Sequence, residues 1–226
     1  MIVAIHQPAY LPWLGYLARI AEADVFVFLD TVQFEKNSFT NRNRIKSANG
    51  PVWLTVPVRQ KGHIGKPLSA LEIDDATDWR TKHLRSIEQN YRKAPRFSRC
   101  EPDLATLLQP GEALLTELCY RQLKFWAGVL DIGTRIVRAS ELPVGGLKSD
   151  LVLNICRHLR ADRYLSGPLG RDYLAEDTFA AAGIEIDYHS YIHPVYSQLY
   201  GPFVPAMSVV DYWMNTADTK LFRGHQ

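Results

Sequence analysis

The side chains best suited to chemistry near the start of the chain lie in one short turn. His6, Gln7, Tyr10 and Trp13 follow an apolar run that begins at Ile2. An unperturbed imidazole titrates near neutral pH, so it can act as a general base or contact a phosphate. Aromatic rings stack on bases and sugars. We therefore predict that His6 is catalytic and that the three other side chains bind substrate. The alternative for His6 is a structural histidine enclosed by the core.

A second group of polar residues follows the apolar run 25–29. Asp30 ends this run, and Gln33 lies shortly after it. Open α/β sheets place their ligands at the carboxyl ends of the strands. We therefore expect Asp30 to orient His6 or to bind magnesium, and Gln33 to contact the substrate.

Residues 41–46 form the most regular basic pattern of the chain, Asn-Arg-Asn-Arg-Ile-Lys. In an extended segment Arg42, Arg44 and Lys46 share one face. Guanidinium groups bind phosphate in a bidentate manner. We predict that these cations, together with Asn41, bind a phosphate or a carboxylate. The alternative is a charged edge strand in solvent, where charges prevent pairing with another edge.

A predicted strand over 163–166 leads into a turn that contains glycine. Its candidate substrate-binding residues are Ser166, Gly167, Arg171 and Asp172. Backbone N–H groups and a guanidinium close to a helix N-terminus suit an anion. The segment lacks the lysine of a P-loop and the spacing of a dinucleotide fingerprint. A tight structural turn is the alternative.

The segment after the last predicted strand, 184–188, is rich in histidine and tyrosine. We expect His193 and Tyr196 in this segment to contact the substrate. His189 and His193 have the spacing of metal ligands on a helix, but Pro194 argues against a helix there. No metal site is predicted.

Residues 2–30 must position the first of these groups. Two apolar runs of this segment are typical of buried parallel strands, and Leu14, Leu17 and Ala18 between them have helical spacing. Gly15 costs a helix about 1 kcal/mol relative to alanine. Either a ligand approaches the backbone at this glycine or the helix packs tightly on the strand.

The remaining elements predict the fold class. The Asn49-Gly50 pair is a hairpin signal that joins 41–46 to a mostly buried strand over 52–58. Residues 78–130 have the pattern of a helical block, and a strand over 134–139 opens a series of alternating helices and strands. We predict an α/β fold with a Rossmann-like, mainly parallel sheet flanked by helices, an inserted β-hairpin and a helical block. One domain is expected over 1–226.

Composition narrows the class of protein further. The 226 residues are 46% hydrophobic and 22% charged, which is ordinary for a globular domain. The net charge of +2 is too small to favour bulk binding of nucleic acid. The cysteines are Cys100, Cys119 and Cys156, which form neither a disulfide framework nor a zinc pattern. With no apolar run long enough for a membrane span and no signal peptide in the sequence, we expect a cytoplasmic protein.

Several sequence runs carry a resemblance to a known family. They are HQPAYLPWLGY from His6, NRNRIK from Asn41, WLTVPV from Trp53, YLSG from Tyr164 and HPVYSQ from His193. The chain resembles the WbqC-like protein family from residue 2 to about residue 215. The resemblance implies a bacterial protein encoded with polysaccharide-assembly genes, and it supplies no reaction.

The opening segment is also similar to the nucleotidyltransferase superfamily that carries the HIGH motif. In that superfamily a His-x-Gly-His sequence begins the helix after the first strand. Here Trp13-Leu14-Gly15-Tyr16 occupies this place, so Trp13 and Tyr16 replace both histidines. Neither side chain carries a positive charge, which leaves the phosphate-binding role to other residues.

These observations favour an enzyme of surface polysaccharide or O-antigen biosynthesis, a transferase or an ATP-dependent ligase. It would move an acyl, aminoacyl or nucleotidyl group on a nucleotide-linked sugar or a similar phosphate-bearing metabolite. A nucleotide with magnesium is the cofactor that this chemistry suggests. The competing hypothesis is a non-catalytic protein that binds a nucleotide sugar or tethers an assembly complex. The enzyme requires His6 and a carboxylate such as Asp30 at one cleft, whereas the binding protein requires only aromatic and cationic groups. The sequence is also compatible with a homodimer.

Overall fold

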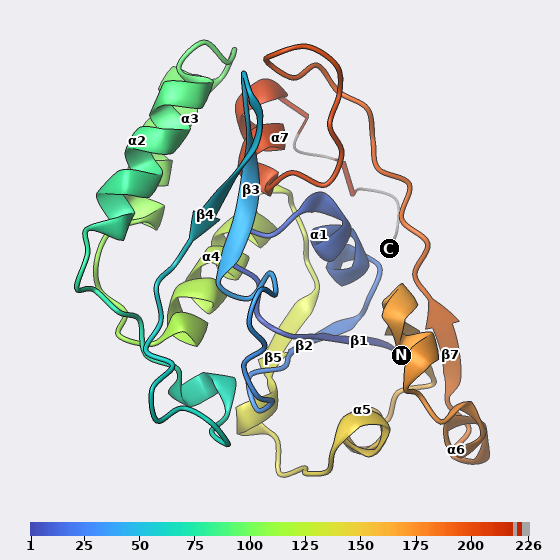
Figure 1. The fold of residues 1–226 in the computed structure, drawn as a ribbon. Helices are drawn as coiled ribbons and strands as arrows, with labels where there is room; N and C mark the ends of the chain where they lie inside the picture. Colours follow the sequence, from blue (N-terminus) through green and yellow to red (C-terminus); the bar gives the residue numbers. More distant parts are fainter. Residues whose placement is uncertain (219–220, 223–226) are drawn as a thin grey trace.

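A five-stranded parallel sheet forms the centre of the molecule (Figure 1). The computed structural model describes residues 1–218 and 221–222. The sheet contains β1 (Ile2–His6), β2 (Val25–Phe28), β5 (Arg135–Arg138), β6 (Arg163–Ser166) and β7 (Glu185–Tyr188), in the order β5-β2-β1-β6-β7. β1 and β2 read Ile-Val-Ala-Ile-His and Val-Phe-Val-Phe, and β2 is buried on both faces. The predicted α/β class is confirmed.

Helices cover both faces of the sheet. Ala4, Phe26 and Phe28 point into a cluster with α1 (Leu14–Ala21) and α4 (Leu115–Val129). On the opposite face, Val25 and Val27 pack with α5 (Lys148–His158) and α6 (Glu176–Ala181). This division follows from the alternation of side chains along a strand.

The hairpin and the helical block lie on the α1 side of the sheet (Figure 1). β3 (Arg42–Ser47) and β4 (Gly50–Thr55) are antiparallel, and the turn between them places Gly50 at φ 103°, as the Asn-Gly signal predicts. α2 (Trp79–Tyr91), α3 (Phe97–Leu107) and α7 (Val209–Asn215) pack around the same cluster. The expectation of a mostly buried second strand is wrong for β4, because Val52 and Trp53 are 37% and 43% exposed.

The connection after β6 contains a short helical turn of its own. A 3-10 helix, η3 (Pro168–Asp172), follows the strand, and α6 begins only at Glu176. Two further 3-10 turns, η1 (Leu68–Ala70) and η2 (Ala139–Glu141), lie after β4 and β5. Among the described residues no helix has both the length and the apolar character needed to cross a membrane.

The strand order creates one switch point next to β1. The chain leaves β1 toward β2 on one side, whereas β6 pairs with β1 on the other side. Connections that leave in opposite directions open a crevice at the carboxyl ends of the two strands. His6 and Ser166 end these strands, so both residues lie at the crevice.

Candidate functional site

A cleft of about 390 Å³ occupies the switch point between β1 and β6. Its walls come from the end of β1, from α1, from the turn at 166–173 and from the start of the segment that follows β7. The volume lies within the range of small-molecule sites. The side chains in its walls are aromatic, apolar, cationic or neutral, and none of the described residues that line it carries a carboxylate.

His6 is a neutral imidazole in this cleft. Its Nδ1 lies 2.9 Å from the carbonyl oxygen of Gln7. A carbonyl only accepts hydrogen bonds, so Nδ1 carries the proton and Nε2 carries the lone pair. Burial, and secondly the charge of Arg19, lower the pKa of His6 to about 3. The His6 side chain in the cleft is therefore uncharged at neutral pH.

Arg19 is the cation nearest to His6 in the cleft. It lies on α1, is only 6% exposed, and its guanidinium faces Gly167 of the turn after β6. Burial lowers the pKa of Arg19, and the nearby hydroxyls of Tyr164, Tyr16 and Tyr173 act in the opposite direction. The cleft therefore combines a positive charge with phenol groups.

An aromatic wall closes another side of the cleft. Trp13, at the start of α1, and Tyr191, after β7, meet edge to face with ring centroids 5.6 Å apart. His189 joins them, with Nε2 3.1 Å from the Glu22 carboxylate and its ring stacked on Tyr191. Such rings offer flat surfaces to a base or a sugar.

Gly15 is required by the ring of Trp13. A Cβ atom at Gly15 would overlap the six-membered ring of the Trp13 indole. The close approach expected at this glycine thus comes from the chain's own tryptophan, which presses against the first turn of α1.

Replacing Gly15 by alanine should give no net stabilisation, although alanine favours a helix by about 1 kcal/mol. The added methyl group must displace the Trp13 ring. Gly128→Ala is the matched control, since this glycine is also in a helix and a Cβ there meets no atom within 4 Å. Thermal melts should show Gly128→Ala rising and Gly15→Ala unchanged or falling. Equal increases would contradict the tight packing of Trp13.

The structure brings four of the residues predicted from sequence into the cleft. They are His6, Trp13, Ser166 and Gly167. The Ser166 hydroxyl donates to the Gly167 carbonyl, and Gly170 leaves room for that hydroxyl. The β1 turn and the β6 turn thus meet in one site.

Asp30 lies outside the cleft. Its buried carboxylate accepts hydrogen bonds from the Ser140 backbone N–H at 2.9 Å and from the Ser140 hydroxyl at 2.7 Å. Ser140 follows β5, on the side of β2 that faces away from β1. The structure therefore shows Asp30 joining the ends of β2 and β5, and no side-chain hydrogen bond links it to His6 within the described part of the chain.

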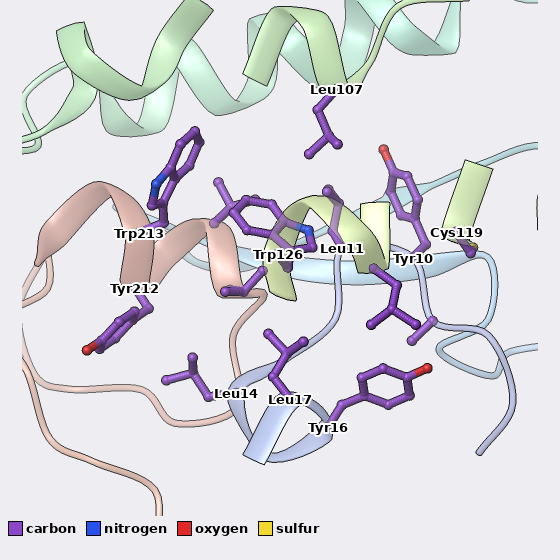
Figure 2. Close-up of a cluster of buried hydrophobic side chains, with 14 of the residues drawn as sticks. Tyr10, Leu11, Leu14, Tyr16, Leu17, Leu107, Cys119, Trp126, Tyr212 and Trp213 are labelled. Carbon is purple, nitrogen blue, oxygen red and sulfur yellow. The ribbon is translucent and has the colours of Figure 1, made fainter. Parts of the chain in front are cut away.

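Tyr10 is part of the core. Figure 2 shows it among buried hydrophobic side chains from several helices. Its hydroxyl lies 2.8 Å from Nδ1 of His83, and its ring packs against Trp79. No surface of the ring is left for a ligand, because Tyr10 is 0% exposed.

Lys46 forms hydrogen bonds with the segment that follows β7. Its buried ammonium donates to the Gln198 side-chain oxygen at 3.0 Å and to the Pro202 carbonyl at 2.6 Å. Gln198 and Tyr196 donate in turn to the buried carboxylate of Asp211, each at 2.7 Å. Tyr196 and Lys46 therefore belong to one buried polar network.

The other predicted residues are also outside this cleft. Arg42 and Arg44 stack on the half-exposed Trp53 ring, at 4.3 Å and 5.4 Å from its centroid. Arg171 lies over the ring of Tyr188 at 3.8 Å. The backbone carbonyl of Gln7 is the hydrogen-bond partner of His6, and the Asn41 side chain donates to the Val56 carbonyl. Gln33 forms an isolated β-bridge with Pro67, and Asp172 is exposed. His193 contacts the Pro194 carbonyl and the ring of Tyr196.

Sequence reasoning did not identify Arg19 and Tyr173 as cleft residues. One signal for Arg19 was present in the sequence: it is the single charged residue in the apolar run of Leu14–Ala21, which the structure buries. Tyr173 lies just beyond η3 and gives no comparable signal. Within the described ranges no three His, Cys, Asp or Glu side chains are grouped to hold a metal ion.

The fold and the site define an α/β protein with a cleft at the switch point of a parallel sheet. The chain belongs to the WbqC-like protein family, whose model matches residues 7–221. It is 36% identical over 215 residues to the uncharacterized protein Rv1507c of Mycobacterium tuberculosis (strain ATCC 25618 / H37Rv). This alignment covers 94% of the chain and 93% of its relative. No solved structure matches the chain.

Proposed function

We propose that the cleft binds a phosphate-bearing small molecule that also carries a ring, such as a nucleotide-linked sugar, in the assembly of a surface polysaccharide. The observation that carries the proposal is the combination of His6, Arg19 and the Trp13–Tyr191 wall at the switch point. The cation suits a phosphate, and the aromatic wall suits a base or a sugar ring. Family membership supports the polysaccharide context.

Group transfer at the same site is the second candidate. It is favoured by His6, whose Nδ1 proton is fixed by Gln7 so that Nε2 holds a lone pair. A negative group beside Arg19 would offset the charge that lowers the pKa of His6, and the imidazole would become a stronger base. Nε2 could then take a proton from the hydroxyl or amine that accepts the transferred group. The position of Asp30 away from the cleft favours binding without catalysis.

A thermal-shift panel of ATP, CTP, UDP-sugars and dTDP-sugars, each with and without magnesium, tests the proposal. A ligand that binds only the folded state raises the melting temperature by mass action. We expect a nucleotide sugar to raise it, and His6→Ala to abolish any turnover. Stabilisation by a free triphosphate alone would favour nucleotidyl or adenylyl transfer instead. No shift with any ligand would contradict the proposal.

A further inference from the structure

Arg19 is a buried cation without an opposite charge. Its exposed fraction is 6%, and among the described residues no carboxylate lies within ion-pair distance of its guanidinium. Its Nε has no hydrogen-bond partner. By contrast, the part-buried Arg138 forms two hydrogen bonds with Glu117, at 2.6 Å and 2.7 Å. Buried charges in proteins are normally paired, because desolvation of an unpaired ion costs several kcal/mol.

The turn after β6 is shaped around this guanidinium. A Cβ atom at Gly167 would overlap Nη1 of Arg19. The backbone of Gly167 is extended, with φ −71° and ψ 164°, a conformation that any residue can adopt. Glycine at this position is therefore explained by the space that Arg19 needs and not by backbone strain.

The groups around Arg19 suit an anion better than a metal ion. His6, Tyr16, Tyr164 and Tyr173 surround it in the cleft, and the lining supplies a guanidinium, imidazoles and phenols. Magnesium is held by carboxylate and phosphate oxygens, and the cleft wall has no carboxylate. The donor set of this chain does not fit the magnesium ion that a nucleotide cofactor would bring.

We propose that Arg19, whose guanidinium fits against Gly167, binds the phosphate group of the ligand directly from the wall of the cleft, and that no metal ion bridges the two. This inference rests on the proposed function and adds that the contact between Arg19 and the phosphate is direct and needs no metal ion. The ligand supplies the counter-charge that the folded chain lacks. The ring of the ligand then lies toward the Trp13–Tyr191 wall, which borders the same cleft.

The inference makes opposite predictions for stability and for binding. Arg19→Met keeps most of the side-chain volume and removes an unpaired buried charge, so the melting temperature without ligand should stay equal or rise. The same change should lower the affinity for the nucleotide sugar by about 30-fold or more, because the loss of a charged contact of about 2 kcal/mol has this effect. The nucleotide sugar used is the one that raises the melting temperature of the wild type. Arg138→Met is the control: it breaks an ion pair outside the cleft, so stability should fall and affinity should persist.

The experiment is isothermal titration with the nucleotide sugar and with inorganic phosphate, in EDTA and again with magnesium. We expect the wild type to bind in EDTA with unchanged affinity in magnesium, and both Arg19→Met and Gly167→Ala to bind weakly. Gly167→Ala retains the charge but forces Arg19 to move, so it tests the inference even if Arg19→Met fails to fold. Full affinity in either folded variant, or a requirement for magnesium, would overturn the Arg19 role while the proposed function stands. No binding by the wild type would overturn both.

Discussion

Lowering the pH from 7 to 4 is expected to reduce the free energy of unfolding by about 3 kcal/mol for each of two histidines. Burial lowers the pKa of His83 to about 4, and burial together with Arg19 lowers the pKa of His6 to about 3. In the unfolded chain both imidazoles titrate near 6.5. The unfolded state therefore binds protons between pH 6.5 and these values while the folded state does not. The contribution of these histidines to the free energy of unfolding is fully present above pH 6.5 and is lost as the pH falls through this window.

The geometry of His83 explains why its protonation is unfavourable. The ring donates a hydrogen bond to the Thr55 carbonyl, and Nδ1 accepts a hydrogen bond from the Tyr10 hydroxyl at 2.8 Å. A second proton would place N–H against that hydroxyl in the core. Urea denaturation at pH 7, 6, 5 and 4 measures the effect, and His83→Gln should flatten the decline by the share of this histidine. Identical pH profiles for the variant and the wild type would show that His83 is not the titrating group.

Asp211→Ala is expected to destabilise the protein by about 3–5 kcal/mol, the usual effect of removing one partner from a buried ionic network. The carboxylate is 0% exposed and accepts hydrogen bonds from Tyr91, Tyr196 and Gln198, each at 2.7 Å. Without it, the buried Tyr91 hydroxyl and the part-buried donors of Tyr196 and Gln198 lose their acceptor, and the Lys46 ammonium loses the favourable charge of Asp211. Urea denaturation gives the free energy, and Asp103→Ala, at an exposed position on α3, should change it by less than about 0.5 kcal/mol.

A double-mutant cycle separates the charge from the hydrogen bonds. Lys46→Met in the Asp211→Ala background should recover part of the lost stability, because it removes the cation that is left without a nearby negative charge when Asp211 is replaced. If the two losses simply add, Lys46 and Asp211 are not coupled. The same network anchors the segment that carries Tyr191 into the cleft. Asp211→Ala should therefore also weaken the ligand shift.

Much of the fold could be predicted from local pattern. The two apolar runs of residues 2–30 specify parallel strands, and Asn49-Gly50 specifies the hairpin turn. These features depend on residues that are close in sequence, so periodicity and turn chemistry are sufficient. The sequence also predicted His6 and Ser166 as site residues of two separate turns, and the structure joins them in one cleft.

Local sequence patterns specified the class of fold and two of the turns that line the cleft, but the contacts of each polar side chain depended on residues far away in the chain. Tyr10, Asp30 and Lys46 have the residue types of a ligand site, yet His83, Ser140 and Gln198 engage them from distant parts of the chain. Arg19 shows the opposite case: it is the single charged residue of the buried helix α1, and the parallel pairing of β1 with β6 brings Gly167 against it. Hydrogen bonds and burial between residues far apart in sequence decide which cation is satisfied within the chain and which remains for a ligand. Local pattern carries no record of such contacts.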